Sequence, residues 1–254
     1  MIHRLVCRCF SAAPLGLVGV LVWPAGPAAL AGETSATVVW YAEQEAGREP
    51  SRARYIVTDA FLRLDEGNDE GGFVLLDRRR RQIYNVVPET GSVLNIDGRG
   101  RRPEPPETLS IAVETSYDAQ APTLEGKRAL TVVLRAGDKV CRSAVVVPGL
   151  LDDVSAAFGE FFRVLAVQQS RTLDNTPRAL QTPCFLARYL YAGDFHARAG
   201  LPLLEWSGSA DRRELLDYTR NVAVDEALLA VPDGLRSYEI APSEPVEAPG
   251  RRRP

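Results

Sequence analysis

Apolar and polar residues alternate in short runs along the first part of the chain, and turn residues separate the runs. Antiparallel strands can be joined by turns this short, whereas a parallel crossover needs about a dozen residues or more. The pattern therefore predicts a series of hairpins. The predicted strands are Ala36–Ala42, Arg54–Leu64, Phe73–Asp77, Gln82–Val87 and Ser92–Ile96.

Further β-rich runs follow the proline-rich loop Gly98–Pro106. Gly137-Asp138 is a hairpin signal between two of these runs, and Asp225–Leu229 is typical of a short helical turn. The predicted strands of this part are Thr108–Thr115, Arg128–Arg135, Lys139–Val147, Cys184–Tyr191, Leu203–Ser207, Arg213–Ala223 and, at a sheet edge, Ser237–Ile240.

The segment Leu151–Ser170 has the period of a helix instead. Its apolar residues recur every three or four positions, which places them on one stripe of a helix. Asp152 and Asp153 fall in its first turn, where the helix dipole favours negative charge. The predicted fold class is α+β, mainly β, with a large antiparallel sheet and one amphipathic helix packed on it. The stripe consists of Leu151, Val154, Phe158, Phe161, Phe162, Leu165 and Ala166.

The first 31 residues have the organisation of a secretory signal peptide. Arg4 and Arg8 precede the apolar stretch Ala12–Trp23, and Ala29-Leu30-Ala31 supplies a small-residue cleavage site. The stretch is shorter than the roughly 20 residues that span a bilayer. We therefore expect cleavage after Ala31, no transmembrane segment, and a periplasmic or secreted product.

The remaining chain is expected to contain one domain, residues 32–241, and a tail, residues 242–254. The tail has almost no apolar residue, so burial cannot offset the entropy of ordering it, and we expect disorder. Two cysteines remain after cleavage, Cys141 and Cys184. Export favours a disulfide between them. Two separate buried thiols are the alternative.

Composition changes this picture little. A 45% hydrophobic and 25% charged chain is an ordinary globular protein. The formal net charge of −3 excludes a general nucleic-acid binder, because such proteins are strongly basic.

Several short motifs resemble the LolA/LolB-like superfamily of periplasmic lipoprotein carriers, and most closely an uncharacterised exported branch of it. The motifs are Leu62–Asp65, Leu75–Asp77, Ile83–Pro88, Gly200–Leu203 and Val224–Gly234. The resemblance implies a curved half-barrel with the helix on its concave face. Leu229 departs from the pattern, because an aromatic residue is usual there. No lipoprotein-binding residue can be transferred from the family.

Large aromatic residues are the candidate ligand-binding positions. In the carrier proteins a cavity lies between sheet and helix, and the resemblance implies such a cavity here. The alternative is a filled core, as in most proteins with a helix on a sheet. The candidate cavity residues are Trp40, Tyr55, Phe61, Tyr84, Phe158, Phe161, Phe162 and Trp206.

No catalytic or metal-binding pattern is evident. His196 is the one histidine after the cleavage site, and it is expected to be a solvated or packed residue. Two cysteines and one histidine do not make a zinc site. The acidic loop Asp65–Gly71 lacks calcium-loop spacing, because position 12 is Leu76. We expect neither an enzyme nor a cofactor.

Two arginine-rich runs, Arg78–Arg81 and Arg99–Arg102, could form one basic patch. Such a patch would meet anionic lipid headgroups or an acidic partner. The alternative is a solvated turn that faces nearby carboxylates.

The sequence thus supports two hypotheses for function. The first is a non-catalytic carrier that holds a lipid, an acylated protein or an apolar small molecule between sheet and helix. The second is a structural or interaction protein of the cell envelope, with a filled core and a protein partner.

Overall fold

The computed structural model describes residues 32–117, 120–121, 123–208 and 211–240. The predicted signal peptide (residues 1–31) and the predicted disordered tail (residues 242–254) lie outside the described residues. Within this part of the chain no helix is long and apolar enough to cross a membrane.

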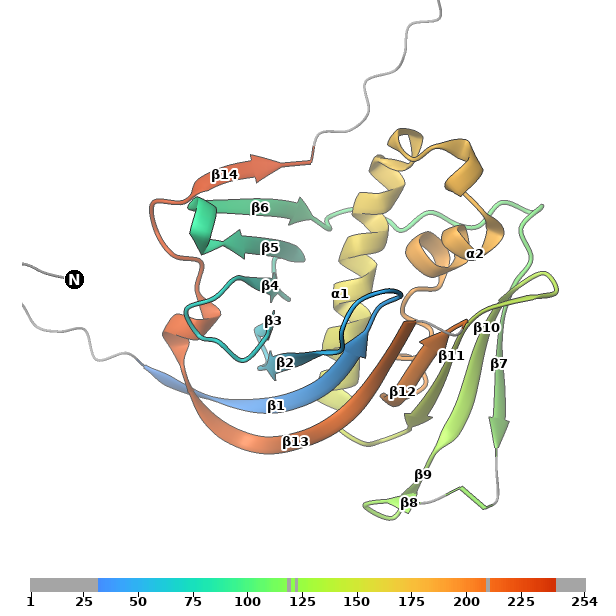
Figure 1. Cartoon of the computed structure of the whole chain (residues 1–254), viewed down its shortest axis with the longest axis horizontal. Coiled ribbons are helices and arrows are strands. Elements are labelled where there is room, and N and C mark those ends of the chain that lie inside the picture. The colour runs from blue at the N-terminus through green and yellow to red at the C-terminus, as the bar shows by residue number, and fades with distance from the viewer. Residues whose placement is uncertain (1–31, 118–119, 122, 209–210, 241–254) are drawn as a thin grey trace, which may run out of the picture. The chain divides into compact units, whose positions relative to one another are not determined.

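The described chain is mainly β, as predicted, and most strands belong to one large antiparallel sheet (Figure 1). The sheet is open, and its order is β14-β6-β5-β4-β3-β2-β1-β13-β12-β11-β10-β7. β8 (Thr123–Leu124) and β9 (Lys127–Arg128) form a separate hairpin. The sheet strands are β1 (Glu33–Gln44), β2 (Ser51–Val57), β3 (Phe61–Asp65), β4 (Phe73–Asp77), β5 (Gln82–Val87), β6 (Ser92–Asp97), β7 (Ile111–Tyr117), β10 (Leu130–Ala136), β11 (Lys139–Val147), β12 (Leu201–Ser207), β13 (Asp211–Asp225) and β14 (Arg236–Glu239).

Long-range pairing joins the two ends of the chain in the middle of the sheet. β1 pairs with β2 on one side and with the 15-residue β13 on the other. β14 is the exception to the antiparallel pattern, because it runs parallel to β6. Residues near the chain ends therefore link the early hairpins to the later ones.

One segment predicted as a single strand forms two strands in the structure. Arg54–Leu64 divides into β2 and β3 because Thr58 forms a turn: its hydroxyl oxygen accepts hydrogen bonds from the backbone N–H groups of Ala60 (3.3 Å) and Phe61 (3.0 Å). Side-chain bonds of this kind favour turns over a continuous strand.

The long helix α1 spans Asp152–Arg171, one residue later at each end than predicted. It packs against one face of the sheet, where Tyr41, Tyr55 and Phe158 touch one another in the core. Phe161 and Leu165 are only partly buried, so the predicted stripe does not lie wholly in the core.

The prediction of a strand at Cys184–Tyr191 is wrong. The segment is helical, with a short helix α2 (Pro183–Leu186) followed by a π-helical turn (Ala187–Tyr191). Thr182 caps α2 by accepting a hydrogen bond from the Phe185 N–H (3.2 Å), and Pro183 occupies the first turn. A short apolar run fits the period of a strand as well as that of a helix. The cap by Thr182 and the proline at the first helical position favour the helix. The 3₁₀ turns are Pro88–Thr90, Leu173–Asn175, Arg178–Leu180 and Glu226–Leu229.

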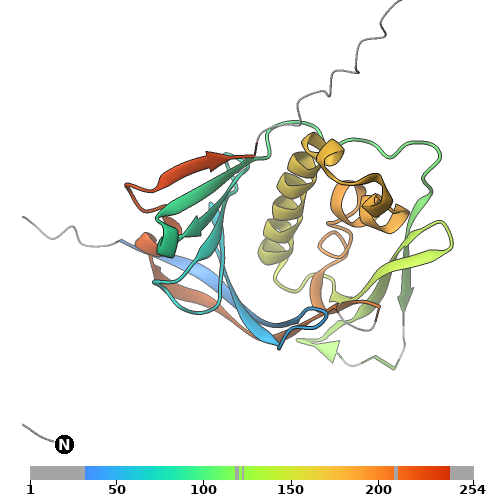
Figure 2. The same ribbon diagram turned by 45° about the horizontal axis from the view of Figure 1, so that its top comes forward.

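Both faces of the sheet are covered in the part formed by β1–β6. α1 and the π-helical turn contact each other, so the helical layer continues from α1 to the part of the sheet at β10 and β11 (Figure 2). On the opposite face, apolar residues of β2–β6 pack against Leu229 and its neighbours. A strand residue can therefore be buried on either face, and burial alone does not place it under α1.

Candidate functional site

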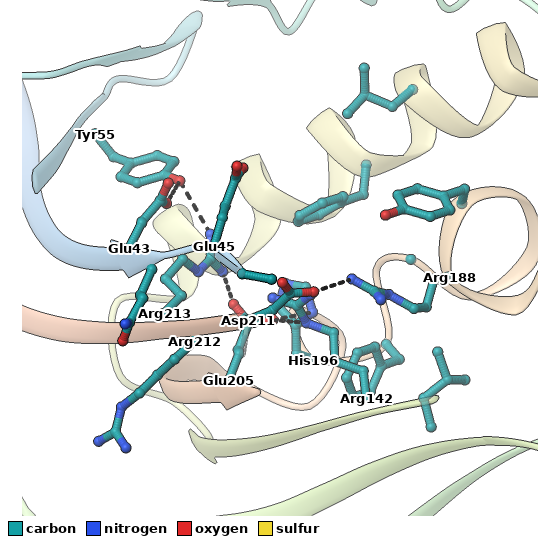
Figure 3. A pocket seen from close by; sticks show the side chains of 18 residues that line it. Glu43, Glu45, Tyr55, Arg142, Arg188, His196, Glu205, Asp211, Arg212 and Arg213 are labelled. Carbon is teal, nitrogen blue, oxygen red and sulfur yellow. Dashed lines mark hydrogen bonds and ion pairs between the residues drawn. The ribbon is translucent and has the colours of Figure 1, made fainter. Parts of the chain in front are cut away.

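A pocket of about 560 Å³ lies beside α1, between the end of β1, strands β10–β13 and the π-helical turn (Figure 3). We call it the His196 pocket. Its walls combine charged and aromatic side chains. The pocket is lined by Glu43, Gln44, Glu45, Ala46, Tyr55, Leu134, Arg142, Phe162, Leu165, Arg188, Tyr189, Gly193, Phe195, His196, Glu205, Asp211, Arg212 and Arg213.

The floor of the pocket holds a buried ion pair. Arg213 of β13 and Glu205 of β12 are in direct ion-pair contact, and both side chains are at least 90% buried. Arg142 of β11 adds a second positive charge 3.3 Å from Glu205 Oε1. Burial raises the pKa of Glu205, but Arg213 and Arg142 outweigh it and bring that pKa down to about 2. The carboxylate is therefore ionised.

His196 lies next to this pair and is neutral. Burial lowers the pKa of its imidazole to about 4, opposed by Glu205 and assisted by Arg213 and Arg142. Nδ1 is 3.2 Å from Glu205 Oε1, but not in hydrogen-bonding geometry, and Nε2 has no hydrogen-bond partner among the described residues. The rings of Phe162 and Phe195 meet the imidazole edge-on, at 5.1 and 5.2 Å. His196 is thus a packed residue, one of the two expected outcomes.

Two tyrosines extend the polar floor toward β1 and β2. The Tyr55 hydroxyl donates to Glu43 Oε1 (2.8 Å) and accepts from Arg213 Nη1 (3.2 Å). The Tyr41 hydroxyl donates to the Pro202 carbonyl (2.8 Å), and the Arg213 guanidinium lies 4.7 Å from the centre of the Tyr41 ring. Burial raises the pKa of both phenols, so each stays protonated.

The opposite wall is supplied by the π-helical turn. Arg188 reaches toward Asp211, with 3.7 Å between Nη2 and Oδ2, and the Ser207 hydroxyl donates to the same oxygen (2.8 Å). The predicted disulfide is confirmed: Cys184 of α2 is bonded to Cys141 of β11. The bond therefore ties the segment that carries Arg188 to the sheet.

The eight aromatic residues predicted to line one cavity lie on two faces of the sheet. Trp40 alternates with the core residues Val39 and Tyr41, and Trp206 follows Glu205, so both point away from the pocket. Phe61 and Tyr84 pack with the core on the opposite face. Tyr55, Phe158, Phe161 and Phe162 remain on the side of α1, and only Tyr55 and Phe162 of them line the pocket.

Sequence reasoning missed the charged floor. Glu205 is the one charged residue in Leu201–Ser207, and a lone carboxylate in an apolar run was the available signal. Arg213 offers no such signal, because Asp211, Arg212 and Glu214 surround it with other charges.

The acidic loop after β3 serves the fold. The Asp65 carboxylate accepts hydrogen bonds from Arg54 (2.8 Å) and Arg63 (2.6 Å), and also from the Gly67 N–H (2.8 Å). Among the residues that the structure describes, no group of three or more His, Cys, Asp or Glu side chains is placed to hold a metal ion.

No protein-family model and no curated protein matches this sequence. Among solved structures, the chain is similar to an uncharacterised conserved protein from Thermus thermophilus, with 12% identity and a TM-score of 0.40 over 79% of this chain and 90% of that one. It is also similar to PNGF-II in two crystal forms, with 9% and 7% identity, TM-scores of 0.38 and 0.40, and 82% of this chain covered in both. These matches cover only 31% and 32% of the PNGF-II chain. Likeness at this level says nothing about the ligand or activity of this protein.

Proposed function

We propose that this protein is an exported, non-catalytic binding protein that holds an amphipathic ligand in the His196 pocket. In this proposal the sheet acts as a half-barrel around α1, as the resemblance to the periplasmic lipoprotein carriers implies. The ligand is a lipid-type or other small molecule with an apolar body and a polar group.

The observation that carries the proposal is the buried Arg213–Glu205 pair at the floor of an open pocket. Burying two charges costs several kcal/mol per ion before their attraction is counted, so an apolar pair would often stabilise the fold as well. An ionised pair beside a cavity is better explained by recognition of a ligand than by stability.

The walls support a ligand of mixed character. Leu134, Phe162 and Leu165 offer apolar surface, whereas Arg142 and Arg188 offer hydrogen-bond donors. A wholly apolar ligand would strip water from these charges without replacing it. Tyr41, Tyr55 and Phe158 fill the space between α1 and strands β1 and β2, which favours the pocket over that interface as the ligand site.

The absence of catalysis is part of the proposal. A hydrolase with a Ser–His–Asp triad would depend on His196, whose side chain is only 2% exposed and is enclosed by Phe162 and Phe195. The Ser207 hydroxyl is bound to Asp211 rather than to this imidazole. A binding role uses the same residues without requiring them to reach a reacting atom.

Adjacent phenylalanines on α1 test the proposal. Anilinonaphthalene sulfonate has an aromatic body and an anionic group, and its fluorescence reports binding. Phe162→Ala removes a pocket wall and should weaken saturable binding about tenfold, the usual effect of losing an aromatic anchor. Phe161→Ala is the matched control, because Phe161 is partly buried against the core and does not line the pocket, so this variant should leave affinity unchanged.

A third variant separates the two parts of the ligand. Arg188→Gln should weaken binding of the sulfonate probe but not of the neutral probe phenylnaphthylamine. Equal effects of Phe161→Ala and Phe162→Ala, or no saturable binding by the parent protein, would contradict the proposal. Melting curves of each variant show that the fold is retained.

An interaction protein of the cell envelope is the second candidate, and the exposed edge of the sheet favours it. Among the described strands β7 pairs with β10 alone, and Val113 and Tyr117 on it are 43% and 54% exposed. Free strand edges are templates for pairing with another chain. Native mass spectrometry of protein purified from its own compartment distinguishes the two: a retained small-molecule adduct supports binding, and a bound protein supports interaction.

A further inference from the structure

Two arginine-rich segments at the open end of the β5–β6 hairpin meet beside α1. The turn Arg78–Arg81 joins β4 to β5, and the loop Gly98–Arg102 follows β6. The Gly98 N–H donates to the Arg81 carbonyl (2.9 Å), and Arg171 of α1 donates to the Asp97 carbonyl (2.8 Å). The two runs that could form one basic patch are therefore neighbours.

A cleft of about 290 Å³ lies where they meet. Four arginines and one glutamate line it, a surplus of three positive charges in a protein whose formal net charge is −3. We call it the Arg81 cleft. Its lining is Leu76, Arg78, Arg81, Gly98, Gly100, Arg102, Glu160, Arg163, Val164 and Val167.

Two of the arginines are held in place by carboxylates. Arg78 donates to both oxygens of Glu160, at 2.7 and 3.1 Å, and to the Thr58 carbonyl (2.8 Å). Arg102 donates to Asp194 at 2.9 Å. These contacts satisfy Glu160, the one carboxylate in the lining, and leave it little capacity to neutralise the other two arginines.

Arg81 and Arg163 are the other two arginines of the cleft. Neither forms an ion pair with any carboxylate in the described part of the chain. Arg163 donates from Nε to the Gly159 carbonyl (2.9 Å), which orients its guanidinium and leaves the terminal nitrogens available. Two guanidinium groups with free donors are suited to bidentate recognition of phosphate oxygens.

The backbone conformation of Arg81 also indicates a role for its side chain. Its φ is +55°, in the left-handed region that glycine adopts readily and residues with a side chain adopt rarely. A glycine would suit this turn better, so the arginine side chain is not there for the turn.

We propose that the Arg81 cleft is a second binding site, which takes a phosphate monoester group. The group belongs either to a soluble ester or to a lipid headgroup, and the chemistry of recognition is the same for both. The site is independent of the proposed function: Phe162 and Leu165 line the His196 pocket, whereas Arg163, Val164 and Val167 line the cleft on another side of α1.

Arg81→Gly tests the site without straining the fold, because glycine suits a φ of +55°. It should bind inorganic phosphate and glycerol phosphate about tenfold more weakly by calorimetry, the usual effect of losing one charge-assisted contact. Arg163→Gln on α1 should act in the same way. Arg79→Gln removes the same charge from a neighbour that is exposed, as Arg81 is, but does not line the cleft, so it should keep parental affinity.

Vesicles identify the source of the phosphate group. Binding to phosphatidylcholine vesicles only when they contain phosphatidic acid, with loss in Arg81→Gly, indicates a lipid headgroup. Binding of glycerol phosphate without vesicle binding indicates a soluble ester. The proposal is overturned if no phosphate probe binds, or if Arg79→Gln weakens binding as much as Arg81→Gly does.

Discussion

Two arginines are buried in the part of the chain that the structure describes, and their surroundings differ. Arg63 donates to Asp65 (2.6 Å) and to the Leu228 carbonyl (2.7 Å), and it lies 3.9 Å from the centre of the Phe73 ring. Arg213 has Glu205 and Tyr55 as partners, but its Nε has none among the described residues. Arg63 is enclosed by structural contacts, whereas Arg213 faces a pocket.

Asp65→Asn should strongly destabilise the protein. Removing this charge leaves the buried Arg63 without its counterion, and breaking a buried pair typically costs about 3–5 kcal/mol. Asp69→Asn is the matched control, because Asp69 also contacts Arg54 but is 57% exposed, and it should change little. Urea unfolding of both variants checks the prediction, and similar losses would refute it.

His196 should make stability depend on pH. Its folded pKa of about 4 lies below its ordinary value of 6.5, so between these values the unfolded chain binds a proton that the folded protein does not. Stability therefore falls as pH drops from 6.5 to 4, by at most about 3 kcal/mol. His196→Gln cannot titrate, so its unfolding free energy should lack this fall. An unchanged slope in the variant would exclude His196 as its source.

Glu205 and Asp65 contribute in a lower pH range. Both have a lowered folded pKa, to about 2 for Glu205, so their stabilisation is present above the ordinary carboxyl pKa and is lost as pH falls toward the folded pKa. The acid-induced loss of stability should thus occur in two stages, the first due to histidine and the second to carboxylates.

At the scale of elements, the segment from α2 to the π-helical turn forms one wall of the His196 pocket, and the Cys141–Cys184 disulfide attaches this segment to the sheet. It contacts β10, β11 and α1, and the Cys141–Cys184 bond closes a loop that contains all of α1. Its position is therefore set partly by packing and partly by the disulfide.

Replacing both cysteines with serine should lower stability by about 4 kcal/mol, as loop-closure entropy predicts for a loop of this length. It should also weaken probe binding, because Arg188 and Tyr189 lose their tether. Thiol counting on denatured, non-reduced parent protein should find neither cysteine free. Two free thiols, or full probe affinity in the serine variant, would contradict this account.

At the scale of the whole described chain, one sheet is assembled from segments far apart in sequence. β14 is the short outer strand next to β6, and all four of its residues are exposed. Its backbone pairs with β6, and the Arg236 side chain donates a hydrogen bond to the Thr90 carbonyl (2.9 Å). The chain beyond Ile240 has almost no apolar residue to add to this edge.

Truncation after Ile240 should leave the melting temperature unchanged, because the removed residues have little to bury. Truncation after Leu235 also removes β14 and should lower stability by about 1 kcal/mol, or roughly 2–4 °C for a chain of this size. Calorimetric melting of both truncated chains checks the difference. A lower melting temperature for the first truncation would show that the tail packs.

Local pattern determined a large part of this structure. The early hairpins, α1 and the Cys141–Cys184 pair follow from alternation, from the helical period and from an even number of cysteines. The hairpins and the helix depend on residues close in sequence, and two cysteines can form only one disulfide with each other. For the same reason, the prediction for Cys184–Tyr191 was wrong: an apolar run of that length satisfies both periods.

Only the tertiary structure decided which residues meet. Alternation predicts that Trp40 and Tyr41 face opposite ways. It does not predict which face α1 covers, because strands β1–β6 have buried apolar residues on both faces. The meeting of Glu205 with Arg213, and of Arg81 with Gly98, depends on strand pairing and loop packing. Both contacts lie within hairpins of consecutive strands, and their register is set by the packed sheet, because the alternation of one strand does not encode which residue of the next strand it faces.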